Sequence, residues 1–170
     1  TMPSPLVARM RQTEETRVAA YRLDQLERMA ASNRAPTNWH RWIVDVIASD
    51  EDLHSGTAGV VDTAFFRTMR AFAARVGAPA EARASLDFLH GIGSWNWAEV
   101  VAATKLLEAS KDSLGWVPDV LLRNGSVVAY IKLGLFDAAT ASLRTFAKRT
   151  AEDPFRERLL GSYLDFADPV

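Results

Sequence analysis

The stretch GLFDAA, residues 134–139, has the same pattern as an earlier stretch, GSWNWA, at residues 93–98. Both read glycine, any residue, aromatic, two residues of any kind, alanine, and their glycines stand 41 positions apart. We interpret each stretch as the corner between two antiparallel helices. Glycine permits the tight turn, the aromatic side chain wedges between the helices, and alanine lets the two backbones approach closely. The pattern predicts stacked helical hairpins and requires no ligand at the aromatic residues.

The spacing of apolar residues is helical along most of the chain. No stretch of five or more residues alternates between apolar and polar, as a half-buried strand would. The clearest helix begins after Asn38, where five apolar residues form one continuous stripe: Trp39, Trp42, Ile43, Val46 and Ile47. The sequence therefore predicts an all-α fold with seven to eight helices joined by short turns.

Glycine and proline residues divide the chain into these helices. The first expected helix covers about 5–32 and ends at the breaker run 33–36, and the second stops at the polar loop 49–59. Further helices are expected at about 57–76, 79–91, 96–111, 117–133, 136–150 and 154–166. Gly91-Ile92-Gly93 is interpreted as a helix break, because no strand precedes it and the third glycine of a phosphate-binding loop is missing.

Residues from about 93 to 166 resemble tetratricopeptide (TPR) helical hairpins. That family carries a tyrosine before the turn glycine, an aromatic residue after it, and a small and then a large apolar residue in the second helix. The matching residues of this chain are Tyr130, Gly134, Phe136, Ala139 and Leu143. The resemblance is irregular, because the offset of 41 positions exceeds the family's 34-residue period. It also departs from the family where Arg123, Ser126 and Val127 replace an aromatic residue and a Leu-Gly pair.

The TPR resemblance implies a protein- or peptide-binding scaffold without catalytic activity. Its concave face would come from the first helix of each hairpin, which in the later hairpin points to Asn124, Val128, Ile131 and Lys132. There, Lys132 and Asn124 would hold a carboxylate or a backbone amide of an extended peptide. Independently of the resemblance, Trp95 and Trp116 each precede a helix near a turn, where a partly exposed indole is a candidate peptide contact.

Two other classes of function stay open. The first is an α-helical enzyme or small-molecule sensor, with a pocket between the N-terminal helices and the hairpins lined by Tyr21, His40, Trp42 and His90. The second is a regulatory or oligomerisation domain of a larger protein, with the long first helix as the face of a homodimer. The sequence contains no nucleophile elbow, phosphate loop or local metal-ligand spacing, so we expect no catalytic residues, no metal and no cofactor.

The composition of the chain limits which partners and which domain organisation are expected. Its 170 residues suit one all-α domain, with N-terminal helices in 1–90 and TPR-like hairpins in 91–170. Twenty basic and 21 acidic residues give a net charge of -1, which favours neither nucleic acid nor an anionic membrane as partner. No apolar stretch is long enough to span a bilayer. Cysteine is absent, which excludes disulfides and thiolate chemistry, and we expect a cytoplasmic location.

Overall fold

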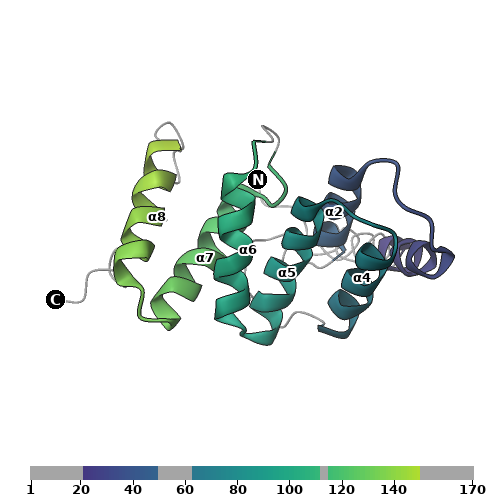
Figure 1. The fold of residues 1–170 in the computed structure, drawn as a ribbon, viewed down its shortest axis with the longest axis horizontal. Helices are drawn as coiled ribbons and strands as arrows, with labels where there is room; N and C mark the ends of the chain where they lie inside the picture. Colours follow the sequence, from purple (N-terminus) through teal and green to yellow (C-terminus); the bar gives the residue numbers. More distant parts are fainter. Residues whose placement is uncertain (1–20, 50–62, 112–114, 150–170) are drawn as a thin grey trace, which may run out of the picture.

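The computed structural model describes residues 21–49, 63–111 and 115–149, and every regular element in them is an α-helix (Figure 1). The described part of the chain has seven helical segments: residues 21–32, α2 (Trp39–Ala48), α4 (Thr63–Arg75), α5 (Ala80–Ser94), α6 (Trp97–Ala109), α7 (Asp119–Lys132) and α8 (Phe136–Arg149). The prediction of an all-α fold is confirmed. The helix expected at 154–166, and the predicted starts of the first and third helices, lie outside the described residues.

Helix α2 forms as the sequence predicts. The side chain of Asn38 caps it by accepting a hydrogen bond from the backbone N–H of Arg41 at 2.9 Å. The predicted stripe faces the core, and its buried members are Trp42, Ile43, Val46 and Ile47. The preceding helical segment ends at Asn33, whose φ of 54° is incompatible with a continuing right-handed helix. The breaker run 33–36 therefore separates these two helices, as expected.

Consecutive helices pack against each other as antiparallel hairpins from α4 to α8 (Figure 1). Figure 1 shows these five helices following one another in chain order along the long axis of the molecule. Helix α2 packs against α5, and its Trp42 ring lies 5.7 Å from the ring of Phe72 in α4. Helix α5 also contacts α7, where Phe88 and Ile92 lie directly against Gly125. The contacts place α2, α5 and α7 next to one another in one layer.

Three of the connections are corners with the same hydrogen-bond pattern. Each contains one residue in the left-handed conformation: Gly77, Trp95 and Gly134, with φ values of 70°, 56° and 71°. The next amide donates to the carbonyl five residues earlier, at 2.8–2.9 Å: Ala78 to Ala73, Asn96 to Gly91, and Leu135 to Tyr130. This Schellman arrangement satisfies carbonyl groups that the end of a helix leaves unpaired. It also defines which positions of the corners are equivalent.

The predicted location of the first corner is wrong by two residues. Helix α5 continues through Gly91-Ile92-Gly93 to Ser94, so this segment is no helix break, and Trp95 makes the turn. Trp95 is therefore equivalent to Gly134, and the corners are 39 positions apart instead of 41. The helix tolerates Gly91 because the glycine is needed for packing. A Cβ added there would lie 2.8 Å from Cγ2 of Val100 in the facing helix.

The prediction that aromatic residues wedge between the helices at these corners is also wrong. Trp95 is 76% exposed and Phe136 is 42% exposed, so neither ring is buried between the helices. Small and bulky residues at equivalent positions fill the space instead. The first corner has Gly91 and buried Val100, and the second has Tyr130 and buried Ala139. The larger side chain has moved from one helix to the other, which keeps the packing close to the density of a protein interior.

Candidate functional site

Trp95 is an exposed tryptophan held in a costly backbone conformation. A non-glycine residue in the left-handed region costs about 1–2 kcal/mol, and the two equivalent corners carry glycine at this position. Trp95 gains little from burial, because three quarters of its surface remains in water. Strained residues are maintained where function requires them more often than where packing does. The indole of Trp95 is therefore a candidate contact for a partner.

We expect Trp95→Gly to stabilise the protein. Glycine adopts the left-handed conformation without strain, and little buried surface is lost, so the free energy of unfolding should rise by about 0.5–1 kcal/mol. Urea unfolding followed by circular dichroism measures the change. The reciprocal control is Gly134→Ala, where nothing lies within 4 Å of an added Cβ and only backbone strain is introduced. It should destabilise by about 1 kcal/mol. A loss of stability in Trp95→Gly would contradict the assignment of strain.

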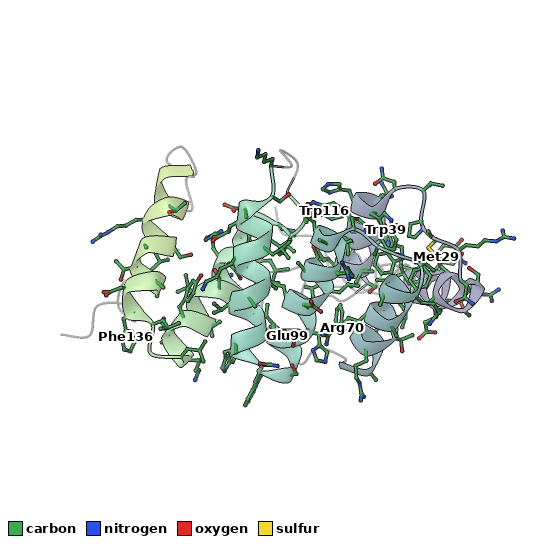
Figure 2. All side chains as sticks on the ribbon, viewed as in Figure 1. Met29, Trp39, Arg70, Glu99, Trp116 and Phe136 are labelled. Carbon is green, nitrogen blue, oxygen red and sulfur yellow. The ribbon has the colours of Figure 1, made fainter. Side chains whose placement is uncertain are left out.

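Further exposed apolar residues surround the corner between α7 and α8. Leu133, Leu135 and Phe136 are each more than 40% exposed, and Lys132 beside them is also exposed. The two corners, α5–α6 and α7–α8, lie on the same long edge of the molecule in Figure 1. Figure 2 shows Phe136 at this edge, with Glu99 and Arg70 further along it. We call Trp95, Leu133, Leu135 and Phe136 the corner edge. Exposed apolar side chains at two corners of one edge are candidates for an interaction surface.

The face of α7 that the TPR resemblance indicates is partly open. Asn124, Val128 and Ile131 are half-buried, and a rotation of 100° per residue places them on one side of the helix. The equivalent positions of α5, which are 39 residues earlier, are fully covered: Ser85, Leu89 and Ile92. Asn124, Val128, Ile131 and Lys132 therefore form a shallow surface that ends at the corner edge.

Trp116 lies apart from that face. Its ring stacks on the imidazole of His40, with ring centroids 3.7 Å apart and an interplanar angle of 21°. It is half-buried, and its Nε1 is buried without a hydrogen-bond partner. Trp116 thus joins the start of α7 to α2. The six residues predicted to bind a peptide are divided between the α7 face, the corner edge and this stacked pair.

The four residues of the alternative pocket have separate surroundings. Tyr21 is mostly exposed, His40 stacks on Trp116, and Trp42 is buried against the rings of Trp39 and Phe72. His90 contacts charged residues of α4 and α6. The two grooves described below are lined by other side chains. Of the first helix, proposed as a dimer face, residues 5–20 lie outside the described residues.

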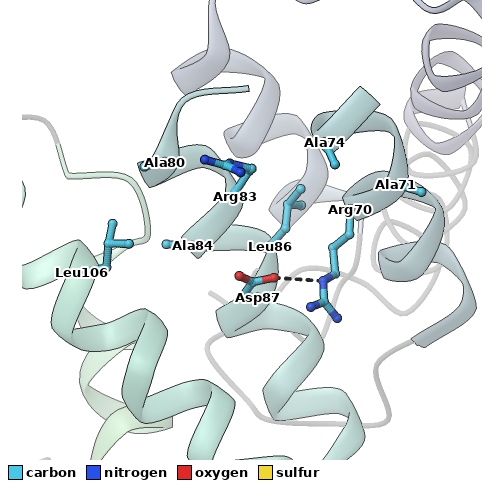
Figure 3. Close-up of a pocket in the computed structure, with 9 residues that line it drawn as sticks. All are labelled: Arg70, Ala71, Ala74, Ala80, Arg83, Ala84, Leu86, Asp87 and Leu106. Atoms are coloured by element: carbon cyan, nitrogen blue, oxygen red, sulfur yellow. Dashed lines mark ion pairs between the residues drawn. The ribbon is translucent and has the colours of Figure 1, made fainter. Parts of the chain in front are cut away.

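A groove runs over α5 between α4 and α6 (Figure 3). It encloses about 430 Å³, and we call it the α5 groove. Its lining consists of four alanines, two arginines, an aspartate and two leucines: Arg70, Ala71, Ala74, Ala80, Arg83, Ala84, Leu86, Asp87 and Leu106. Sequence reasoning missed this groove, because its lining comes from three helices. The feature of the sequence that indicates it is the spacing of Ala80 and Ala84 in α5.

A second groove of about 330 Å³ lies between α6 and α8, with Tyr130 of α7 in its lining. Leu106 in the first groove and Thr145 in the second stand 39 positions apart, like the corners. At the position of Ala84, α7 carries Arg123, which is 2% exposed. Its Nη1 donates to Oγ of Ser142 at 2.7 Å, and its Nη2 pairs with Glu108. The arginine thus contacts two side chains that line this groove, Ser142 and Glu108, whereas Ala84 leaves the corresponding space of the α5 groove open.

Charged side chains cross three helices at one end of the α5 groove. Arg70 of α4 pairs with Asp87 of α5 at 2.9 Å and with Glu99 of α6 at 2.7 Å. Nδ1 of His90 lies 2.9 Å from Arg70 Nη1 and 3.0 Å from Glu99 Oε2. A single ring nitrogen either accepts from the guanidinium or donates to the carboxylate, so these two hydrogen bonds are alternatives. Two carboxylates thus pair with the single guanidinium of Arg70 within the protein.

Burial raises the pKa of Asp87 above its ordinary value of 3.8, the Arg70 guanidinium opposes this shift, and the Glu99 carboxylate adds to it. Because the folded state binds this proton more tightly than the unfolded chain, the proton's contribution to stability is present at low pH. It is lost as the pH rises through the folded pKa. We therefore expect Asp87→Asn to be more stable relative to wild type at pH 7 than at pH 4.

Urea unfolding at the two pH values tests this expectation for Asp87. Asp24→Asn, on an exposed carboxylate of the first helical segment, controls for the removal of one negative charge. A difference between Asp87→Asn and wild type that does not change with pH would show that burial of Asp87 does not dominate its titration.

Among the described residues, no three His, Asp or Glu side chains lie close enough to hold a metal ion. No described helix combines the length and apolar character needed to cross a bilayer. Comparison with protein-family models, curated proteins and solved structures finds no match for this chain. Function is therefore inferred from its own geometry.

Proposed function

We propose that this protein is a TPR-like helical-hairpin scaffold that binds a segment of another protein and has no chemistry of its own. The observation that carries the proposal is Trp95, an exposed indole kept in a strained conformation where equivalent corners have glycine. Tryptophan is strongly enriched among the residues that dominate binding energy at protein interfaces. The fold keeps this backbone strain and leaves the indole exposed. The indole therefore contributes favourable free energy only when a partner covers it.

The binding surface in this proposal extends from the corner edge onto the open face of α7. The apolar corner residues supply surface that a partner removes from water, at about 25 cal/mol per Å². Lys132, whose side chain has no hydrogen-bond or ion-pair partner among the described residues, supplies a charge at the border between the two regions. Val128 and Ile131 continue the apolar surface along α7. A partner with apolar side chains and a carboxylate at one end fits this arrangement.

Peptide selection tests the proposal. A peptide library displayed on phage is panned against the immobilised protein, and the affinities of selected peptides are measured for wild type and variants. Trp95→Gly and Lys132→Glu should each weaken binding about tenfold or more, since a central aromatic contact is worth about 2 kcal/mol. Trp95→Gly is informative because we expect it to stabilise the fold, so lost binding cannot come from unfolding. Lys105→Ala, exposed on α6 two turns beyond the corner, is the control.

The outcome that rejects the surface is equal affinity of wild type, Trp95→Gly and Lys132→Glu for the selected peptides. Failure to select any peptide would reject the scaffold function itself. The enzyme or sensor alternative gains no support from the geometry, because its four residues have separate surroundings.

A further inference from the structure

The α5 groove carries an inference that is independent of the corner edge. Its floor is α5, with Ala80, Ala84 and Asp87 in the lining, and its walls are α4 on one side and Leu106 of α6 on the other (Figure 3). Leu106 is 42% exposed and borders the cavity as a large apolar side chain. Four methyl groups in place of longer side chains leave room for the side chain of another molecule.

The charges of the groove are unequal at its two ends. At one end, Arg70 is paired with both Asp87 and Glu99. One turn toward the start of α5, the side chain of Arg83 is exposed and has no hydrogen-bond or ion-pair partner among the described residues. Figure 3 shows its guanidinium next to Ala80, away from the Arg70–Asp87 pair. The groove therefore offers one exposed positive charge, unpaired among the described residues, at the end away from the Arg70 cluster.

We propose that the α5 groove binds an acidic segment of another protein, whose large apolar side chain enters the cavity beside Leu106 while a neighbouring carboxylate pairs with Arg83. The planar guanidinium favours a carboxylate, which it binds through two parallel hydrogen bonds. Of the three charged side chains in the lining, Arg70 and Asp87 pair with each other, which leaves Arg83 to contact a ligand, whereas specific small-molecule pockets use several polar groups. The apolar anchor supplies affinity, and Arg83 selects acidic over neutral or basic segments.

The test uses a fluorescein-labelled helical peptide that presents Leu and Glu one turn apart. Matched versions carry Gln or Lys in place of Glu, or Ala in place of Leu. Fluorescence anisotropy with the full chain should show the Leu/Glu peptide binding about tenfold more tightly than the Gln or the Ala version. In Arg83→Glu the preference should reverse toward the Lys peptide. Leu106→Ser should weaken binding of the Leu/Glu peptide to the level of the Ala version.

Both substituted side chains are exposed, so the variants should keep the fold, which circular dichroism verifies. Trp95→Gly should bind the Leu/Glu peptide as wild type does, which separates this groove from the corner edge. Three results would overturn the proposal: no binding at millimolar peptide, equal binding of the Glu and Gln versions by wild type, or unchanged charge preference in Arg83→Glu.

Discussion

Gly125→Val should lower the free energy of unfolding by about 2–3 kcal/mol, the upper part of the usual range for overpacking a filled core. A Cβ at this position would lie 2.5 Å from Cζ of Phe88 and 2.7 Å from Cδ1 of Ile92. Both are ends of side chains, but Phe88 is fully buried and Ile92 nearly so, and neither has solvent to move into. The contact between α5 and α7 must therefore widen. Urea unfolding at equilibrium measures the change.

A double-mutant cycle separates packing from helix propensity at this contact. Gly125→Ala gains about 1 kcal/mol of propensity, which masks part of the steric cost. Combined with Phe88→Leu, which shortens the opposing ring, the alanine should fit, and the pair should be more stable than the sum of the single changes by about 1 kcal/mol or more. Strict additivity would show that Gly125 and Phe88 do not limit the approach of the two helices.

Phe72→Ala should destabilise the protein more than Gly125→Val does, by about 3–5 kcal/mol. Phe72 is fully buried in α4, and its ring contacts Trp42 and Trp39 of α2 at centroid distances of 5.7 and 6.4 Å. Removing it leaves a cavity between these two helices and takes away the aromatic contact that joins them. Thermal unfolding should show a large decrease in Tm.

Phe136→Ala is the matched control for Phe72→Ala. Phe136 is 42% exposed at the corner edge, so its removal leaves no closed cavity and should lower the free energy of unfolding by only about 1 kcal/mol. If the two phenylalanine variants lost similar stability, the described packing of α2 on α4 would be wrong.

The sequence predicts the helices well because periodicity and capping are local properties. Asn38 and the apolar stripe behind it lie within three turns, and the structure reproduces them. The corners are predicted less accurately, because either of two nearby glycines, Gly91 or Gly93, could mark the first turn. Gly93 matches the pattern, yet Gly91 is the residue that packing requires, since it faces Val100 of the next helix. Packing requires glycine at position 91 because of a contact between two helices. A residue pattern within one helix carries no information about that contact.

The candidate sites are predictable only in part. The place of Trp95 before a helix makes it a candidate in the sequence, but its exposure and strain follow from where α5 ends. Arg123 shows the limit most clearly. The sequence presents it as a departure from the TPR pattern, whereas it is buried and joins Glu108 of α6 to Ser142 of α8. Its partners lie 15 and 19 positions away on other helices, and no helical period links such residues.

The packing of each helix against its neighbours in sequence has a kinetic consequence. Most contacts close short loops, and the entropy lost in closing a loop grows with its length. A chain with such low contact order should fold within microseconds to milliseconds. The free energy of local unfolding should also differ between helices, because α5 is held by α2, α4, α6 and α7 together. Amide hydrogens of α5 are therefore expected to exchange last. The part of the molecule that unfolds least readily then lies beneath the α5 groove.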